Sequence, residues 1–98
     1  MHKAIKLLAK IPKGKITTYK ELALTTKSSP RAIGQVMRNN KDGVKYPCYK
    51  VICSDGSLGG YGGKTHGKNI KNKIRKLESD GIVIKNSKIN LKKYLHKF

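Results

Sequence analysis

Two helix-start signals close together in the chain constrain the fold most. Thr18 followed by Glu21 forms a capping box and predicts a helix over about residues 19–26. Ser29 can cap a second helix, because Pro30 fits the first helical turn. Two short helices joined by a tight polar turn predict a helix-turn-helix, with an ordinary helical hairpin as the alternative. The polar side chains that the second helix leaves available for a partner are Arg31, Gln35 and Arg38.

The charge of the chain indicates what that partner is. Lys and Arg total 23 against 5 Asp and Glu, which gives a formal net charge of +18 over 98 residues. A compact domain with this charge repels itself, and nucleic acid is the commonest polyanion that relieves the repulsion. The alternatives are a lysine-rich surface that is only solvated, or anionic lipid, which the lack of a long basic and aromatic helix disfavours. We therefore expect the second helix to contact DNA.

The rest of the sequence completes a mainly α, winged-helix-like domain with a small β element. Apolar spacing predicts helices over residues 2–10 and about 66–79. Residues 51–52 suggest a short strand or a buried turn, and residues 81–89 read as a small hairpin. The basic tail, residues 92–98, is expected to fray. We expect one domain over residues 1–98, with no membrane span and no secretory signal.

Cysteine and histidine usage argues against metal or disulfide chemistry. The two cysteines, Cys48 and Cys53, are too few for a disulfide framework or a structural zinc site. The histidines are scattered without metal-ligand spacing. We expect no metal or organic cofactor, and a reduced, cytoplasmic protein that is nucleoid-associated if the cell is prokaryotic.

Cys48 is the candidate nucleophile. The preceding Pro47 can hold it in one orientation, and the cations Lys45, Lys50 and Arg31 would favour thiolate over thiol. A thiolate reacts well with a soft alkyl carbon. The alternative is that Cys48 is only a small buried apolar residue, which is the common fate of a single cysteine.

Several motifs together resemble the C-terminal domain of the O6-alkylguanine-DNA alkyltransferases, the methylated-DNA–protein-cysteine methyltransferases. The resemblance extends from about residue 11 to residue 79. Residues 47–51 read Pro-Cys-Tyr-Lys-Val, where the family signature is Pro-Cys-His-Arg-Val. The supporting stretches are residues 12–19, residues 30–40, the glycine-rich loop at 57–61 and the Leu-Glu pair at 77–78. The family's N-terminal domain lies outside the resemblance, and activity is expected without it because all the motifs lie in the part present.

The resemblance implies a single-turnover transfer of an alkyl group from O6-alkylguanine in double-stranded DNA to Cys48, by a monomer. Asn40 would brace the active-site turn, and Glu78 would sit behind it. The target guanine must be flipped out of the stack, because its O6 alkyl carbon is otherwise out of reach. Arg31 would fill the gap left in the duplex, and Tyr19 would crowd the neighbouring phosphate. Gln35 and Arg38 would add DNA contacts, and the base pocket would be formed by Tyr61, Val51 and Gly62.

Tyr49 is the main departure from the family, which has His there to relay a proton through water to a glutamate. An imidazole titrates near neutrality and a phenol near pH ~10, so Tyr49 is a poor base. It would hold an ordered water, or the lysine-rich field would keep Cys48 ionised without a base. We expect slower or more pH-dependent transfer, and a rate that is flat between about pH 6 and 9 would contradict this.

Two rival functions stay open. Alkyltransferase-like proteins bind the damaged base without accepting the alkyl group, and they typically carry Trp or Ala in place of the cysteine. The retained Cys48 favours transfer, and Tyr49 favours the rival. A plain winged-helix DNA-binding protein explains the charge and the helix-turn-helix, but leaves the Pro47-Cys48 turn and the glycine-rich loop unexplained.

Overall fold

The computed structural model describes residues 3–39, 46–58, 68–86 and 88–98, with the side chains of the fourth helix from residue 71 onward. The elements, in order, are α1 (Lys3–Leu8), β1 (Thr17–Thr18), α2 (Tyr19–Thr26), α3 (Pro30–Arg38), the 3₁₀ helix η1 (Cys48–Lys50), β2 (Val51–Ile52), α4 (Lys68–Ser79), β3 (Ile84–Lys85), β4 (Lys88–Ile89) and α5 (Leu91–Tyr94). Strands β1 and β2 pair in parallel, and β3 and β4 pair antiparallel. In the part of the chain that is described, every helix is too short or too polar to cross a membrane.

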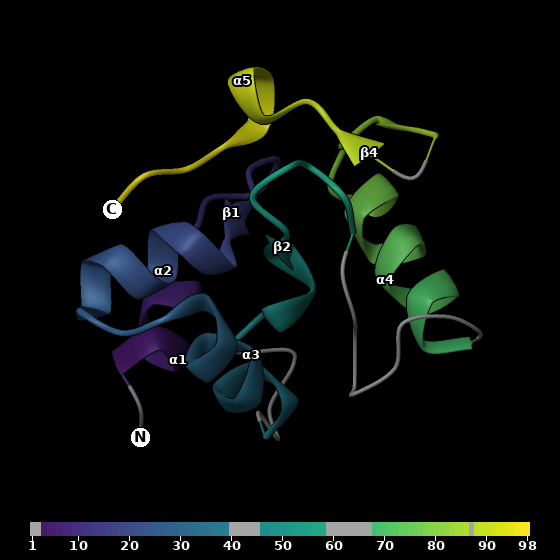
Figure 1. Ribbon diagram of the computed structural model, residues 1–98. Helices are drawn as coiled ribbons and strands as arrows, with labels where there is room; N and C mark the ends of the chain where they lie inside the picture. The colour runs from purple at the N-terminus through teal and green to yellow at the C-terminus, as the bar shows by residue number, and fades with distance from the viewer. Residues whose placement is uncertain (1–2, 40–45, 59–67, 87) are drawn as a thin grey trace.

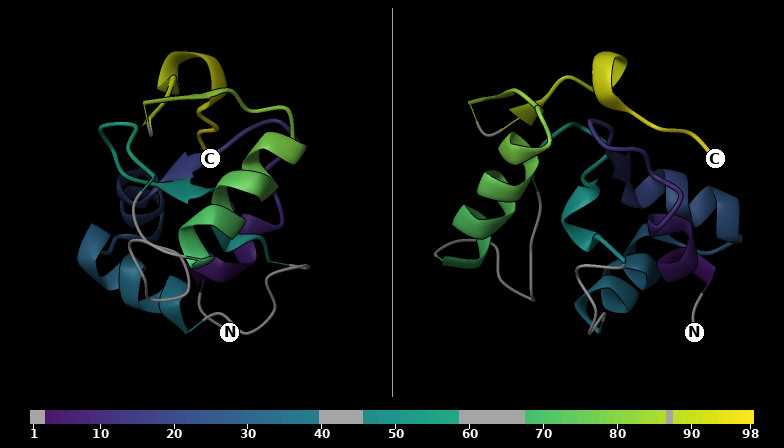
Figure 2. Two further views of the ribbon diagram at one scale, coloured as in Figure 1. Left: turned by 90° about the vertical axis from the view of Figure 1, so that its right-hand side faces the viewer. Right: turned by 180° about the vertical axis from the view of Figure 1, so that it is seen from behind.

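Helices α1, α2 and α3 gather on one side of the short β1–β2 pair, and α4 lies on the other side (Figure 1). The same division is visible from behind in Figure 2. Helix α5 and the C-terminal residues cross the top of the molecule. The mainly α, winged-helix-like architecture expected from the sequence is confirmed, and the parallel pairing of β1 with β2 is an addition to it.

The predicted caps define the helix-turn-helix. The backbone N–H of Glu21 donates to Thr18 Oγ1 at 3.1 Å, and that of Ala32 donates to Ser29 Oγ at 3.2 Å. Helix α2 ends where Lys27 adopts a left-handed conformation, with φ of 57°. The predicted bounds of α2 and the predicted start of α3 are therefore confirmed, because side-chain oxygens satisfy backbone donors that a helix leaves unpaired at its start.

Two apolar clusters hold the fold. The first joins the helix-turn-helix to α1 and consists of Ala4, Ile5, Leu8, Ile11, Leu22, Ala23, Ile33, Met37 and Val51. The second lies under α4 and α5 and consists of Ile16, Ile52, Leu58, Leu77, Ile82, Ile89 and Tyr94. Neighbouring side chains of a strand point to opposite faces, so Val51 joins the first cluster and Ile52 the second. Strand β2 thus forms the seam between them.

The C-terminal segment is ordered against the domain, and the expectation of a frayed tail over residues 92–98 is wrong for residues 92–96. Asn90 caps α5 by accepting from the Lys92 N–H at 3.0 Å. The Ile16 N–H donates to the Tyr94 carbonyl at 2.9 Å, and the His96 N–H donates to the Ile16 carbonyl at 2.7 Å. The segment folds because it buries Tyr94 and supplies partners to backbone groups beside β1.

Candidate active site

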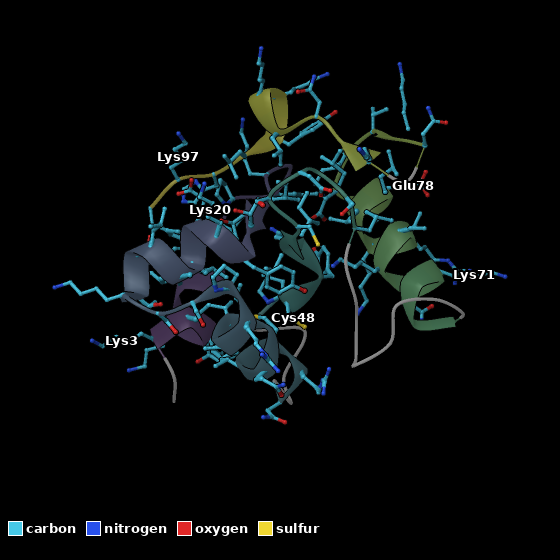
Figure 3. All side chains as sticks on the ribbon, viewed as in Figure 1. Lys3, Lys20, Cys48, Lys71, Glu78 and Lys97 are labelled. Carbon is cyan, nitrogen blue, oxygen red and sulfur yellow. The ribbon has the colours of Figure 1, made fainter. Side chains whose placement is uncertain are left out.

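Cys48 begins the 3₁₀ turn η1 at the seam between the two clusters. Pro47 precedes the turn, and the Cys48 N–H donates to the Tyr46 carbonyl at 2.9 Å. The Cys48 carbonyl in turn accepts from the Val51 N–H, which ties the turn to β2. The side chain is half-buried, carries a free thiol and packs against the first cluster, as Tyr19 does (Figure 3). The predicted fixed orientation of Cys48 therefore has a structural basis in this short turn.

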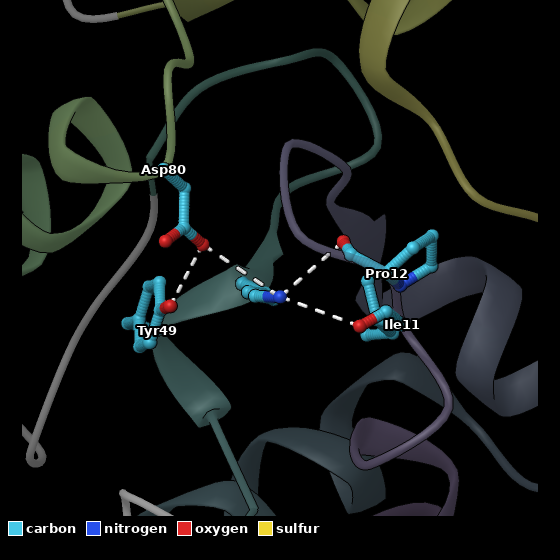
Figure 4. Close-up of polar contacts among 5 residues, drawn as sticks. Ile11, Pro12, Tyr49 and Asp80 are labelled. Atoms are coloured by element: carbon cyan, nitrogen blue, oxygen red, sulfur yellow. Dashed lines mark hydrogen bonds and ion pairs between the residues drawn. The ribbon is translucent and has the colours of Figure 1, made fainter.

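Tyr49 points the other way, into the second cluster, and meets a carboxylate (Figure 4). Its hydroxyl donates to Asp80 Oδ2 at 2.8 Å. The same oxygen lies 3.6 Å from the Lys50 ammonium. The phenol of Tyr49 is therefore the hydrogen-bond donor of this pair, and the Asp80 carboxylate is the acceptor.

Lys50 is almost fully buried and links Asp80 to the loop before β1. Its Nζ atom donates to the carbonyls of Ile11 and Pro12, both at 3.3 Å. These bonds anchor the loop before β1 and hold the ammonium beside Asp80. The cation predicted to lie near Cys48 is thus directed toward Asp80 and the loop, while Lys45 lies outside the described residues.

The structure brings Asp80 to Tyr49, where the sequence had suggested Glu78. Glu78 is exposed on the last turn of α4. Asp80 follows the helix and precedes Gly81, whose φ of +88° turns the chain. The signal was present in the sequence, because the family pattern Leu-x-x-Glu-Gly places its acidic residue three positions after Leu77, at Asp80.

Lys73 is a buried cation that the sequence reasoning missed. Its side chain is fully buried, and Nζ donates to the carbonyls of Val51 at 2.7 Å and Leu58 at 2.5 Å. Burial lowers the pKa of this ammonium to about 8, against the opposing effect of the Cys53 and Cys48 thiols. Lys73 lies four residues before Leu77, so helical periodicity had placed it on the apolar face. The carbonyl of Val51, a residue that the resemblance places in the base pocket, already accepts one bond from Lys73.

Tyr19 starts α2 beside both cysteines. Burial, together with the Cys53 and Cys48 thiols, raises the pKa of its phenol to about 12. The phenol is therefore a neutral hydrogen-bond donor at any physiological pH. Next to it lies an open pocket of about 430 Å³ between α2, Pro30 and Ser54, into which Cys53 also faces. This pocket borders the helix-turn-helix and does not include Cys48 or Val51.

The remaining predicted residues divide into two groups. Arg31, Gln35 and Arg38 are all exposed along α3, as expected for a DNA-contacting face. Asn40, Tyr61 and Gly62 lie outside the described residues. The described site therefore comprises a cysteine at the seam, a tyrosine–carboxylate pair behind it, a buried ammonium and an exposed polar helix face.

The family model for the DNA-binding domain of 6-O-methylguanine DNA methyltransferase matches residues 1–82. The chain belongs to this family. It is 49% identical over 90 residues to a bifunctional methyltransferase/endonuclease from Picrophilus torridus, covering 90% of this chain and 28% of that protein. It is 42% identical over 88 residues to a methylated-DNA–protein-cysteine methyltransferase from Candida glabrata, covering 88% of this chain and 40% of that protein. The chain thus spans well under half the length of these two relatives.

Two solved structures show the same fold. Atl1 from S. pombe, in complex with damaged DNA containing O6-carboxymethylguanine, aligns with a TM-score of 0.84 and 26% identity. The alignment covers 98% of this chain and 93% of Atl1. The O6-methylguanine-DNA methyltransferase of Pyrococcus kodakaraensis aligns with a TM-score of 0.71 and 33% identity, covering 82% of this chain and 44% of that one. The chain is therefore similar in structure both to an alkyltransferase and to a protein of nearly its own length that was solved in complex with damaged DNA.

Proposed function

We propose that this chain repairs DNA by accepting the alkyl group of O6-alkylguanine on Sγ of Cys48. The observation that carries the proposal is the 3₁₀ turn that packs Cys48 against the first cluster, as Tyr19 does, and directs the next residue, Tyr49, to Asp80 on the other side. A half-buried free thiol in a turn preceded by proline suits a nucleophile that reacts once. Membership of the alkyltransferase family supports the assignment of the substrate.

The reaction is a displacement at the alkyl carbon. A bond forms between Cys48 Sγ and that carbon, and the bond from carbon to guanine O6 breaks. The electron pair of the broken bond stays with guanine, which takes up the proton that the thiol gave. The product is a thioether and unmodified guanine, so one protein molecule repairs one base.

The residues around Cys48 supply charge and a proton path. The Lys73 ammonium provides a nearby positive charge to balance a thiolate. In this proposal a water ordered by the Tyr49–Asp80 pair carries the thiol proton away from Cys48, while the phenol proton stays directed at Asp80. In this proposal Asp80 takes the place assigned to Glu78, and Lys50 holds Asp80 in position through its ion pair.

Flipping of the base is assigned to the helix-turn-helix. Arg31, exposed in the first turn of α3, enters the duplex and fills the gap, and Gln35 and Arg38 contact the backbone beside it. Tyr19 donates to a phosphate as a neutral phenol, because its pKa is about 12. The roles of Asn40, Tyr61 and Gly62 at the base stay predictions.

A second function is recognition of alkylated guanine without transfer. It is favoured by the match to Atl1, which covers nearly all of both chains, and by Tyr49 in the place of the family's histidine. A phenol is a weak base near neutral pH, so the Tyr49–Asp80 pair would then only brace the turn. Retention of Cys48 favours transfer.

The deciding experiment is mass spectrometry of the intact protein after incubation with duplex DNA that contains one O6-methylguanine. We expect a single added methyl group, mapped to Cys48 and absent from Cys48→Ser. Tight binding to the lesion with no change in mass would replace transfer by recognition. Equal affinity for damaged and undamaged duplex, with no change in mass, would leave only a basic DNA-binding domain.

The role of Tyr49 is tested with Tyr49→His and Tyr49→Phe. We expect the histidine variant to transfer faster near neutral pH, because a general base contributes about 10²–10⁴-fold when its pKa matches the working pH. We expect the phenylalanine variant to be slower than the native chain, because it loses the hydroxyl that orders the proton-carrying water with Asp80. Equal single-turnover rates for all three proteins would remove Tyr49 from the proton path.

A further inference from the structure

The C-terminal segment, residues 83–98, lies beyond the matched family region yet carries a concentrated charge. It contains five lysines and no acidic residue. All five are exposed: Lys85, Lys88, Lys92, Lys93 and Lys97. A cationic surface of this density attracts a polyanion.

Backbone pairing directs the end of this segment, from Leu95 onward, toward the helix-turn-helix. Ile16 and Leu95 form a parallel bridge, and the His96 N–H donates to the Ile16 carbonyl. Because the pairing is parallel, the residues after Leu95 run in the same direction as those after Ile16, toward the first turn of α2. The chain end accordingly lies near α2 in each view (Figures 1 and 2).

The lysines of α5 and the tail are presented by an ordered scaffold. The Lys15 ammonium donates to the Lys93 carbonyl at 3.0 Å, which adds a further cation to the same surface. The Lys93 ammonium lies 5.3 Å from the centre of the Tyr94 ring. Since Tyr94 is itself buried in the second cluster, α5 is fixed to the domain and its lysines have a defined position.

We infer that Lys92, Lys93 and Lys97 form a second contact with the phosphate backbone of the duplex that α3 binds, on the flank beside α2. Duplex DNA is the partner that fits, because the tail continues toward the first turn of α2, which carries the exposed Lys20 and Tyr19, to which a phosphate contact is assigned above. A duplex presents one negative charge about every 1.7 Å along its axis, so a group of exposed lysines meets phosphates in any sequence. The inference rests on DNA binding by α2 and α3, and not on transfer at Cys48.

The test is the salt dependence of affinity for an undamaged duplex of about two helical turns, measured by fluorescence anisotropy with the full chain. The test variant is Lys92→Gln/Lys93→Gln/Lys97→Gln. The matched control, Lys3→Gln/Lys6→Gln/Lys71→Gln, removes the same charge from exposed positions on α1 and α4. Lys3, Lys71 and Lys97 lie at well-separated places on the molecule (Figure 3).

We expect the test variant to reduce the slope of log affinity against log salt by about 2 to 3, because each phosphate that the protein no longer neutralises lowers the slope by about 0.9. The control should change the slope by less than about 1. Lys92→Arg/Lys93→Arg/Lys97→Arg should retain the native slope, because binding to phosphates needs the charge. Equal changes in the test and control variants would overturn the inference, since only net charge would then matter.

Thermal stability and binding stoichiometry are measured as well, to separate loss of a phosphate contact from unfolding and from binding of a second duplex. In thermal unfolding, all three variants should show the midpoint temperature of the native chain. If the test variant unfolds at a lower temperature, Lys92→Gln/Lys97→Gln takes its place, and we expect it to reduce the salt slope by about 2. Sedimentation with excess duplex should give one duplex for each protein molecule. Two duplexes per native chain and one per test variant would overturn the inference, because the lysines would then bind a separate duplex. The assay uses undamaged DNA, so a failed transfer reaction at Cys48 leaves its result unaffected.

Discussion

The two halves of the molecule are stabilised by different means. The first cluster, under the helix-turn-helix, is built from apolar side chains with few polar groups among them. The second cluster adjoins a buried ammonium, Lys73, and the polar group of Tyr49, Asp80 and Lys50. A helix that docks on DNA needs a rigid apolar base, whereas chemistry at a thiol needs charges held in fixed places. Cys48 lies at the seam, between the apolar first cluster and the polar groups that adjoin the second.

Buried polar groups make the second half more sensitive to pH and to substitution. An ammonium removed from water costs free energy unless hydrogen bonds replace the lost solvation. The carbonyls of Val51 and Leu58 provide two such bonds to Lys73. These bonds also fix β2 and residue 58 to α4, so the cation contributes to the geometry behind Cys48.

The largest effect that distinguishes the two halves is the response of stability to pH. Burial lowers the pKa of Lys73 from 10.5 to about 8. Between these values the unfolded chain holds a proton that the folded chain has released, so raising the pH through this window stabilises the fold by up to about 3 kcal/mol. Tyr19 acts in the opposite direction above pH 10, because its pKa is raised to about 12 and only the unfolded chain loses the proton there. The free energy of unfolding should therefore rise from about pH 8 and fall again above about pH 10.

Lys73→Met is the control for this pH profile. Urea unfolding at several pH values should show the rise above pH 8 in the native chain and a much flatter profile in the variant. Tyr19→Phe should keep the rise and lose most of the fall above pH 10. A native profile that is flat or falling between pH 8 and 10, with the same shape in Lys73→Met, would contradict the assignment of the effect to Lys73.

Substitution of one glycine in each half compares how the two backbones tolerate a side chain. Gly56 has φ of +90°, and a Cβ there would lie 2.8 Å from the Ile89 carbonyl oxygen. We expect Gly56→Ala to destabilise the fold by about 2 kcal/mol or more, from left-handed strain and displacement of β4. At Gly34, within α3, an added Cβ would have no other heavy atom within 4 Å. We therefore expect Gly34→Ala to raise the free energy of unfolding by about 0.5–1 kcal/mol. Chemical denaturation of both variants checks the sign; two substitutions of equal effect would remove the contrast.

Local signals in the sequence predicted the first half well. The caps at Thr18 and Ser29 define α2 and α3 through contacts within one helical turn, which a sequence pattern records directly. The second half depends on contacts between distant residues, such as Tyr49 with Asp80 and Ile16 with Leu95. A local pattern can indicate one residue of such a pair, as Leu-x-x-Glu-Gly does for Asp80, but it does not record the contact between the two.

For the same reason, the sequence indicated Cys48 and the exposed polar face of α3 but not the groups behind the thiol. The choice of Glu78 over Asp80 followed from an inexact count along the Leu-x-x-Glu-Gly pattern. Lys73 was missed because the apolar spacing of this helix was read from its hydrophobic residues alone, and a lysine at a buried position was not considered. Its burial becomes evident only when the Val51 and Leu58 carbonyls are placed beside it.

The smallest expected effect is the loss of one helix cap, which tests whether the C-terminal segment unfolds separately from the helix-turn-helix. Ser29→Ala and Asn90→Ala each remove one side-chain cap, at a cost of about 1 kcal/mol. We expect Ser29→Ala to lower global stability by that amount. Helix α5 spans only Leu91–Tyr94 and is held by a few contacts, so Asn90→Ala should mainly favour local opening.

Amide hydrogen exchange separates the two responses. In Asn90→Ala, the His96 amide, which donates to the Ile16 carbonyl, should exchange about fivefold faster, the factor that corresponds to about 1 kcal/mol. Amides in α2 and α3 should keep their native rates. If all of them accelerate together, the segment and the helix-turn-helix unfold as one unit, and the lysines of α5 are as firmly placed as Arg31. If only the segment responds, DNA binding at Lys92, Lys93 and Lys97 must also offset the free energy of keeping α5 folded against the domain. Asn90→Ala should then weaken DNA affinity even though it replaces no lysine.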